Sequence, residues 1–393
     1  MKRIRITLMI VMASAAVALA AADDKAPAAQ GRHIDLAVCL DTSNSMDGLI
    51  DSAKQKLWAV VNELATAKPR PIFRVALYQY GNNSLDKETG WVQKVCDLSD
   101  DLDTVYDKLF KLTTNGGTEY VARVVRAATD ELKWDTGKDS LRIIFVAGNE
   151  PATQDDKLKL QDICAASAAK GIIINTIFCG PEATGRESGW ADAAKWADGR
   201  YASIDQDKGT VVIATPYDKK LVELGAGLNT TYVGYGARGK GGAANQAAQD
   251  QNALTLGEPA MAQRAAAKAG DLYKNAGWDL VDATKDGTVK LAEVDKDALP
   301  AEMKKMAPEE QKAYLEKKAT ERAELQKQIA ELNAKREAFV KEEMTRKGLD
   351  EKASFDAVLR SAVREQAVAK AFTFEAPPVP AEPKPETPKS DGK

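Results

Sequence analysis

The chain has 393 residues, and its 55 basic and 58 acidic residues leave a formal net charge of -3. This near balance excludes the strong electrostatic attraction typical of nucleic-acid-binding proteins, so nucleic acid is not an expected partner. A chain longer than about 250 residues exceeds what one hydrophobic core usually supports. The sequence therefore predicts more than one folded unit.

Residues 1–22 have the composition of a secretory signal peptide. Basic residues in MKRIR precede an apolar stretch that begins at Ile6, and small residues with Ala-x-Ala spacing follow it. This order predicts cleavage near Ala20 or Ala22 and export to the periplasm or the medium. The apolar stretch is short for a membrane span, no Cys follows it to carry a lipid, and later stretches are less apolar. No membrane anchor is therefore expected after cleavage.

The four cysteines are Cys39, Cys96, Cys164 and Cys179, and the only histidine is His33. Zinc is not predicted, because no Cys-x-x-Cys pair is present and the histidine is not suitably spaced. Export permits disulfides, but Cys39 and Cys179 lie in runs that predict buried strands, where a free thiol behaves as a small apolar residue. The number of disulfides stays open.

From residue 34 to about 228, short apolar runs alternate with segments of helical periodicity. Strands are predicted at 34–40, 73–81, 91–96, 141–148, 171–180 and 200–204. Helices are predicted at 46–68, 100–112, 119–134, 154–170, 187–198 and 216–228. Strands that are apolar along their length and separated by helices predict an α/β fold, with a doubly wound, mainly parallel sheet flanked by helices.

The composition changes after residue 230. Residues 231–300, rich in Gly and Ala at their start, predict a linker with short helices. Residues 301–374 predict a charged α-helical region, dense in Glu, Lys, Arg and Ala over 302–347. Residues 375–393 combine prolines with charges and predict a disordered tail.

The long helix predicted for 302–347 has a coiled-coil-like seam that is interrupted. Apolar residues recur at spacings of three, four, seven or their sums, at Leu315, Leu325, Ile329, Leu332 and Phe339. Basic residues fall on equivalent positions, at Lys318, Arg322 and Arg336. The interruption favours a hairpin over a long coiled coil, with a second helix that carries Phe355, Val358, Leu359, Val363 and Val368. Whether these helices pair within one chain or between two stays open.

Residues 282–293, DATKDGTVKLAE, match a calcium-binding EF-hand loop in outline. Asp282, Asp286 and Gly287 fit its first, fifth and sixth positions, and Glu293 fits its twelfth. Lys290 stands at the ninth position, where a cation would meet another positive charge. An ordinary Asp-Gly turn is therefore the prediction.

The sequence offers no pattern for catalysis. A serine or cysteine nucleophile needs a neighbouring base, and His33 lies just outside the first predicted strand. The GxSxG, HExxH and P-loop patterns are absent from the sequence. A non-enzymatic protein is expected.

The stretch DTSNS directly follows the first predicted strand, at the edge of a doubly wound sheet where ligands bind. Asp41, Ser43 and Ser45 alternate along it, and one carboxylate with two hydroxyls suits a hard divalent cation. A serine that only caps the following helix is the alternative. Farther along, TNGGTEY places Thr118 in a Gly-rich turn between two predicted helices.

Together, the DTSNS stretch, the GGT turn and the α/β alternation resemble the von Willebrand factor type A (VWA) domain, over about residues 33–230. The resemblance implies a metal-ion-dependent adhesion site (MIDAS). It implies that Asp41, Ser43, Ser45 and Thr118 bind Mg²⁺ or Mn²⁺, and that a carboxylate of a protein partner completes the coordination. The whole chain also resembles a group of exported bacterial proteins that carry this domain, through segments such as FVAGNEP and NAGWDLVDA.

One acidic residue of the family pattern is missing. Where the family has Thr-Asp-Gly at the end of the fourth strand, this sequence has VAGNEP, which places Gly148 in the position of the aspartate. Glu150 and Asp155 are candidate substitutes. With Asp41 as the single carboxylate, the affinity for a cation should fall and a partner's carboxylate should matter more.

Two hypotheses follow for the whole protein. The first is an exported, non-enzymatic binding protein that uses a VWA domain with a divalent-metal-dependent ligand site. The second is a structural or scaffolding protein of the cell envelope, which assembles through its C-terminal helices and has a metal-free VWA domain.

Overall fold

The computed structural model describes residues 31–204, 211–349 and 355–374, which belong to one compact unit. The predicted signal peptide and the predicted proline-rich tail lie outside the described residues. Among the helices of the described ranges, none is both long and apolar enough to cross a membrane.

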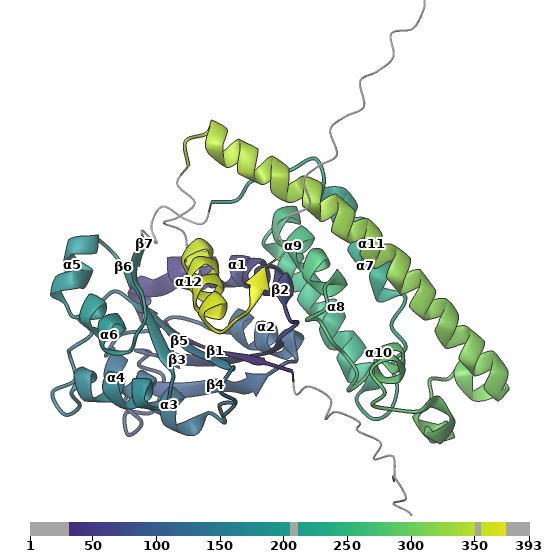
Figure 1. Ribbon diagram of the computed structural model, residues 1–393, viewed down its shortest axis with the longest axis horizontal. Coiled ribbons are helices and arrows are strands. Elements are labelled where there is room, and N and C mark those ends of the chain that lie inside the picture. Colours follow the sequence, from purple (N-terminus) through teal and green to yellow (C-terminus); the bar gives the residue numbers. More distant parts are fainter. Residues whose placement is uncertain (1–30, 205–210, 350–354, 375–393) are drawn as a thin grey trace, which may run out of the picture. The chain divides into compact units, whose positions relative to one another are not determined.

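A six-stranded sheet in the order β4-β3-β1-β5-β6-β7 forms the centre of the α/β part (Figure 1). Its strands are β1 (His33–Asp41), β3 (Ile72–Tyr80), β4 (Val92–Ser99), β5 (Leu141–Gly148), β6 (Ile173–Cys179) and β7 (Tyr201–Ile204). Strand β4 is antiparallel to its neighbour, and the other neighbouring strands run parallel. The predicted doubly wound, mainly parallel α/β class is confirmed, and all six strands lie close to their predicted ranges.

Strand β1 is buried on both faces because alternate side chains of a strand point to opposite sides of the sheet. Ile34 and Leu36 pack into one core, and Ala37 and Cys39 into the other. The first core is covered by α1 (Asp47–Ala65), α2 (Leu102–Phe110) and α12 (Phe355–Ala369). The second is covered by α3 (Val121–Glu131), α4 (Leu160–Ala169) and α6 (Trp190–Trp196), with α5 (Glu182–Glu187) beside β7.

Helices also form the segment predicted to be a linker. The helical part contains α7 (Asp218–Asn229), α8 (Gly239–Thr255), α9 (Glu258–Ala269), α10 (Leu280–Lys285) and α11 (Pro308–Arg346). Short 3-10 turns lie at Asn44–Met46, Leu291–Glu293, Lys296–Ala298 and Met303–Lys305. Helix α8 packs on α2, and α9 packs on α1. The composition rich in Gly and Ala led to the prediction of a linker with short helices, but small side chains also let helices approach closely.

Buried charges join α9 to its neighbours. The fully buried Arg264 donates hydrogen bonds to Asp103 on α2 at 2.7 Å and to Asp250 on α8 at 2.6 Å. Lys268, also fully buried, donates to Asp250 at 2.7 Å and to Asn229 on α7 at 2.5 Å. Each buried cation therefore meets an acceptor, which burial requires.

Helix α11 uses its basic residues in the same way. Arg322 lies 2.7 Å from both Asp279 and Asp282, and Arg336 lies 2.8 Å from Asp218. Two of the three basic residues that interrupt the predicted seam, Arg322 and Arg336, are thus buried ion-pair partners of the segments around α10 and α7, whereas the partly buried Lys318 pairs with Glu321 on its own helix. Helix α11 packs on α7, α9 and α10.

Within the described residues, helix α12 packs on the α/β part and does not form the predicted hairpin with α11. Leu359 and Val363 are buried in the same core as α1, and α12 also packs on β5. Asn175 on β6 and Gln366 exchange two hydrogen bonds, of 3.0 and 2.8 Å. Two short strands, β2 (Ala67–Lys68) and β8 (Thr373–Phe374), pair antiparallel beside it. The α/β part is therefore built from 33–204 and 355–374, with the helical part inserted between them.

The cysteines, whose pairing the sequence leaves open, are all free thiols. Cys39, Cys164 and Cys179 are buried, and Cys96 is partly buried. Burial raises the pKa of Cys164 to about 12. These thiols therefore act as small apolar residues in the core.

The EF-hand-like stretch is an Asp-Gly turn, as predicted. Asp282 lies in the first turn of α10, where it pairs with Arg322 at 2.7 Å and accepts a hydrogen bond from the backbone N–H of Asn275 at 3.0 Å. Gly287 has a φ of +71°, which a residue with a side chain rarely adopts. The carboxylate of Asp282, which would be the first ligand of a calcium loop, instead forms an ion pair with Arg322.

Candidate metal centre

The carboxyl end of β1 lies at the point where the strand order reverses. The chain passes from β1 to β3 on one side and later to β5 on the other. Crevices at such points are where doubly wound sheets bind ligands. Asp41 is the last residue of β1 and is in register with Tyr80 at the end of β3.

The loop after β1 brings the three residues of the DTSNS pattern together. The backbone N–H of Ser43 donates to Asp41 Oδ1 at 2.8 Å, and the hydroxyls of Ser43 and Ser45 lie 3.2 Å apart. Asn149, just after β5, donates from Nδ2 to Ser45 Oγ at 2.9 Å. Ser43 precedes the 3-10 turn without making a side-chain capping bond, and Met46 precedes α1. The helix-cap interpretation therefore does not hold for Ser43.

Asp41 is an unusual carboxylate, because its side chain is 0% exposed and its Oδ2 has no hydrogen-bond partner within the described residues. Burial, and then the charge of Glu119, raise the pKa of Asp41 to about 8, although hydrogen bonds from Ser43 act in the opposite direction. A buried carboxylate oxygen without a donor or a cation is costly. This environment suits a group that meets a positive charge when the site is filled.

The loop that carries Thr118 is tied to the DTSNS loop by backbone hydrogen bonds. Asn44 N–H donates to Gly116 C=O at 2.8 Å, and Asn115 N–H donates to Thr42 C=O at 3.0 Å. Gly116 has a φ of +57°, which bends the chain at this point. Thr118 is partly buried in the same loop. The two loops implied by the family resemblance therefore lie side by side.

Glu119 is a site residue that the sequence pattern does not identify. A Cβ at position 81 would lie 2.6 Å from Glu119 Cγ and 2.8 Å from Asp41 Oδ1, so Gly81 leaves the space that the two acidic side chains share. Glu119 is 8% exposed. Burial, and then Glu150, raise its pKa, while hydrogen bonds from Ser43 and Gln154 lower it. Its only signal in the sequence is its place directly after Thr118.

Gly148 lies at the end of β5, and the space beside it is taken by aromatic side chains. A Cβ here would lie 2.5 Å from Tyr80 Oη, 3.0 Å from Asp41 Oδ2 and 3.2 Å from Trp190 Cη2. The Tyr80 hydroxyl donates to Ala147 C=O at 3.0 Å, which holds it in place. An aspartate does not fit at this position unless Tyr80 moves.

The two candidate substitutes for the missing aspartate differ. Asp155 is bound to Arg123, with its Oδ2 2.6 Å from Nε. Burial raises the pKa of Asp155, but the hydrogen bond and the charge of Arg123, together with backbone hydrogen bonds from Lys157 and Leu158, lower it overall. Asp155 is therefore the ion-pair partner of Arg123, and the prediction that it could replace the missing aspartate is wrong. Glu150 is exposed, and its charge raises the pKa of both Asp41 and Glu119, so it borders the site.

The donor set consists only of oxygen atoms. In the described parts of the chain, no group of three or more His, Cys, Asp and Glu side chains could hold a metal ion, so hydroxyl groups are needed as well. Carboxylate and hydroxyl oxygens suit Mg²⁺ or Mn²⁺ better than soft metals. The residues present at the end of β1 therefore fit a hard divalent cation.

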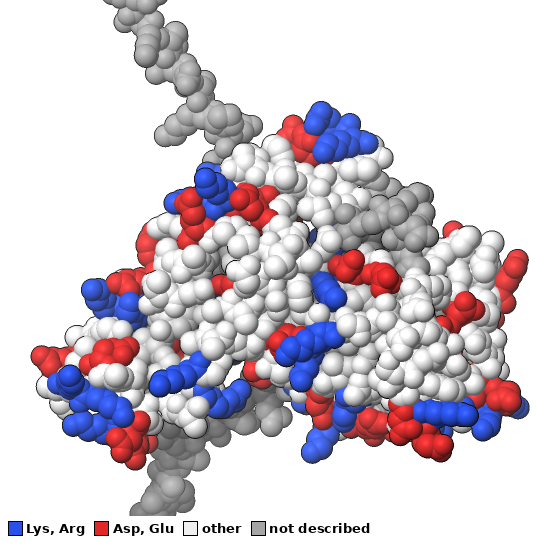
Figure 2. All heavy atoms as spheres, turned by 180° about the vertical axis from the view of Figure 1, so that it is seen from behind, with Lys and Arg blue, Asp and Glu red and all other residues white. Residues whose placement is uncertain are grey.

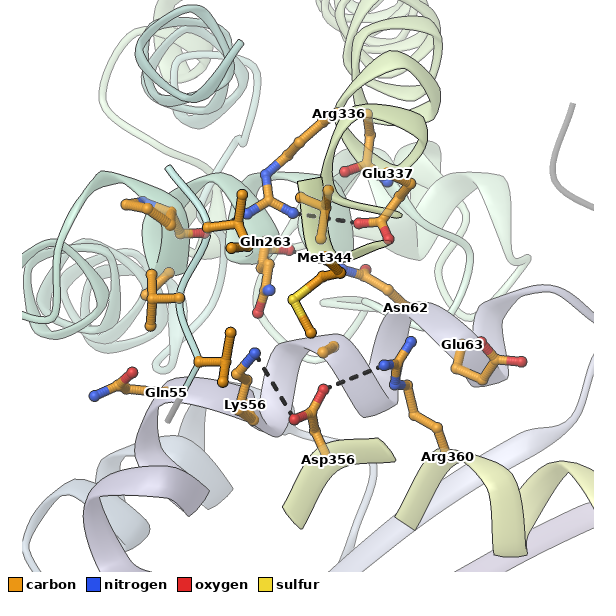
Figure 3. A pocket seen from close by; sticks show the side chains of 18 of the residues that line it. Gln55, Lys56, Asn62, Glu63, Gln263, Arg336, Glu337, Met344, Asp356 and Arg360 are labelled. Carbon is orange, nitrogen blue, oxygen red and sulfur yellow. Dashed lines mark hydrogen bonds and ion pairs between the residues drawn. The ribbon is translucent and has the colours of Figure 1, made fainter. Parts of the chain in front are cut away.

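A hollow of about 360 Å³ lies between α1, α9, α11 and α12, away from the end of β1 (Figure 3). Charged side chains line it, and they pair with one another, either between two helices or within one. Lys56 lies 3.7 Å from Asp356, and Arg360 lies 3.3 Å from the same carboxylate. Because these charged side chains already form ion pairs with one another, we place the functional site at the end of β1 and not in this hollow.

No protein-family model matches the chain, and no curated protein matches it. Solved structures similar to it include VWA domains. Proximal thread matrix protein 1 from the mussel byssus, in a structure with a zinc-occupied MIDAS motif, is 14% identical over 45% of this chain and 43% of its own, with a TM-score of 0.33. The SpRpn10 VWA domain is 17% identical over 46% of this chain and 100% of its own, with a TM-score of 0.35.

A von Willebrand factor type A protein from Catenulispora acidiphila is 14% identical over 45% of this chain and 40% of its own, with a TM-score of 0.32. This chain thus spans less than half the length of the mussel and Catenulispora chains. The likeness concerns the fold alone, and the fold class rests on the sheet order described above.

Proposed function

We propose that this chain is an exported, non-enzymatic protein that binds a protein partner through a divalent cation at the end of β1. The observation that carries the proposal is the buried Oδ2 of Asp41, which lacks a partner among the described residues. Asp41, Ser43, Ser45 and Thr118 would hold Mg²⁺ or Mn²⁺. When bound, the cation supplies an open coordination position for an oxygen atom, expected to be a carboxylate of the partner.

A cation would offset the free-energy cost of burying the ionised carboxylate of Asp41. Two unit charges of opposite sign attract each other strongly where water is excluded, and a buried carboxylate gains more from this attraction than an exposed one. The hydroxyls of Ser43 and Ser45 already lie 3.2 Å apart beside it. The chain's own residues would therefore orient the ligand oxygens before the cation arrives.

The position of the only histidine supports a non-enzymatic role. His33 begins β1 and Asp41 ends it, which separates them by about 26 Å at roughly 3.3 Å per residue. His33 instead lies 3.8 Å from Asp35 and 3.7 Å from Asp135. It is too distant to serve as a general base at the proposed site.

The surface charge agrees with a protein partner rather than nucleic acid. Figure 2 shows Lys and Arg side chains interspersed with Asp and Glu side chains over the described residues of one face. A nucleic-acid-binding face would instead gather basic side chains into a patch or stripe. Export rests on the signal peptide that residues 1–22 predict.

The scaffolding alternative has less support. Helix α11 packs on α7, α9 and α10, and α12 packs on α1 and β5, so both helices use their buried faces within one chain. Self-association through them would have to use the remaining, mostly charged surface. We therefore do not propose it as a second function.

The test compares partner capture by the immobilised protein under three conditions. The wild-type chain in Mg²⁺ is compared with the same chain in EDTA and with Asp41→Ala in Mg²⁺, each exposed to an envelope extract. A partner retained only by the wild type in Mg²⁺ is expected, and the exposed residue Asp51 on α1 provides a matched control, Asp51→Ala. A partner that binds equally well in EDTA and to Asp41→Ala would contradict the proposal.

A further inference from the structure

We infer that Glu119 supplies the second carboxylate of the cation site, from the Thr118 side of Asp41, in place of the aspartate absent from position 148. The inference rests on the proposed function and deepens it, because it assigns a residue to a ligand position for which the sequence pattern gives none. It also replaces the expectation that Asp41 is the single carboxylate.

The space around Asp41 Oδ1 is arranged for a second acidic side chain. Glu119 Cγ and Asp41 Oδ1 both lie within 3 Å of the point where a Cβ at position 81 would stand, at 2.6 and 2.8 Å. At position 117, a Cβ would collide with Glu119 Oε1 and would lie 3.2 Å from Ser43 Cβ. Gly81 thus leaves room for the methylene groups of Glu119 beside Asp41, and Gly117 leaves room for the Glu119 carboxylate beside Ser43.

The space around Asp41 Oδ2 is closed to a residue at position 148. Tyr80 Oη lies 2.5 Å and Trp190 Cη2 lies 3.2 Å from the point where a Cβ at this position would stand. Tyr80 is fully buried and its hydroxyl is bound to Ala147 C=O. Tyr80 therefore occupies the space that an aspartate at position 148 would need, and the second acidic residue of the site comes from another loop.

The charges agree with this arrangement. Ser43 lies beside both acids, because its backbone N–H donates to Asp41 Oδ1 at 2.8 Å and its Cβ borders the same space at Gly117 as Glu119 Oε1. Each acid is buried, and the pair repel each other when both are ionised. A divalent cation neutralises two carboxylates, whereas a single carboxylate would leave one positive charge of the cation uncompensated.

The experiment measures Mn²⁺ binding to the wild type, Glu119→Gln and Glu150→Gln by calorimetry on the full mature chain. Glu119→Gln keeps the size and one acceptor oxygen but removes the charge, and Glu150→Gln removes a charge that is exposed at the rim. The dissociation constant for Mn²⁺ should rise by at least about tenfold in Glu119→Gln and by less than about threefold in Glu150→Gln, because a lost ligand matters more than a screened charge.

The stability of Glu119→Gln in EDTA distinguishes a cation ligand from a residue that only holds the loop in place. If Glu119 only braces the loop through Ser43 and Gln154, Glu119→Gln should unfold more easily. If it is a cation ligand that repels Asp41, the variant should be as stable as the wild type or more stable. If Glu119→Gln does not fold, Glu119→Asp decides, because a carboxylate withdrawn by one methylene should bind Mn²⁺ more weakly.

The outcomes distinguish this inference from the proposed function. Wild-type protein that binds no Mn²⁺ would overturn the proposed function. Wild-type protein that binds Mn²⁺ with the same affinity as Glu119→Gln, or as Glu119→Asp where that variant is used, would overturn only the role of Glu119.

Discussion

Asp41→Asn should stabilise the cation-free protein at neutral and alkaline pH. The substitution keeps the shape of the side chain and the oxygen that accepts from Ser43 N–H at 2.8 Å. It removes a carboxyl group that is 0% exposed and whose Oδ2 has no partner within the described residues. A residue retained at a cost in stability is typical of a functional site.

The magnitude follows from the pKa of Asp41, which burial raises from 3.8 to about 8. The folded chain therefore holds this proton more tightly than the unfolded chain, so the free energy of unfolding of the wild type falls as the pH rises from about 4 to about 8. At pH 7 the difference from the ordinary value corresponds to an upper limit of about 4 kcal/mol, at about 1.4 kcal/mol per pH unit. Because the new amide N–H groups must also be buried, we expect a gain of about 2 kcal/mol.

The assay is urea denaturation in EDTA at pH 5 and pH 8, for the wild type, Asp41→Asn and the exposed control Asp51→Asn. The advantage of Asp41→Asn over the wild type should be larger at pH 8 than at pH 5, and Asp51→Asn should show no such change. An advantage that is absent at pH 8, or equal at both pH values, would refute the reasoning.

Three further predictions concern packing. Arg322→Met should lower the free energy of unfolding by about 3–5 kcal/mol, because Asp279 stays buried without its cation; a loss below about 1 kcal/mol in urea denaturation would contradict this. Leu359→Ala should cost about 2–4 kcal/mol because Leu359 lies in the core under α1, and a neutral result would mean that α12 does not belong to that core. Native alkylation with iodoacetamide should leave the buried Cys164 unmodified in mass spectra until denaturant is added, since burial raises its thiol pKa to about 12; rapid native labelling would argue against this.

The sheet could be predicted from the sequence because most of its strands contain runs of apolar residues. In β1, which is buried on both faces, the run from Leu36 to Leu40 is continuously apolar, and few other structures explain such a run. The place of α12 could not be predicted in this way. Its apolar residues, such as Leu359 and Val363, show only that one face is buried, and either α11 or the distant sheet would satisfy them.

The helical part was underestimated for a related reason. Periodicity reveals apolar contacts, but α9 and α11 also contact their neighbours through paired charges such as Arg264 with Asp103 and Arg322 with Asp279. In a sequence, a basic residue that forms a buried ion pair looks the same as one on a solvated face.

The candidate site was predictable in part. Asp41, Ser43 and Ser45 are neighbours in the sequence and alternate, which gives their oxygens a chance to point at one spot, but only the resemblance to the VWA domain made a shared ligand the prediction. Glu119 reaches the site only because Gly81 and Gly117 leave room for it, and this steric relation between three loops has no signal in the spacing of residues.

The central claim is that the end of β1 holds a divalent cation through Asp41. The most direct measurement is calorimetric titration of the full mature chain with Mg²⁺ and with Mn²⁺, beside Asp41→Ala. The account predicts saturable binding of one cation by the wild type and its loss in Asp41→Ala. Absence of binding to the wild type, or equal binding by Asp41→Ala, would contradict it.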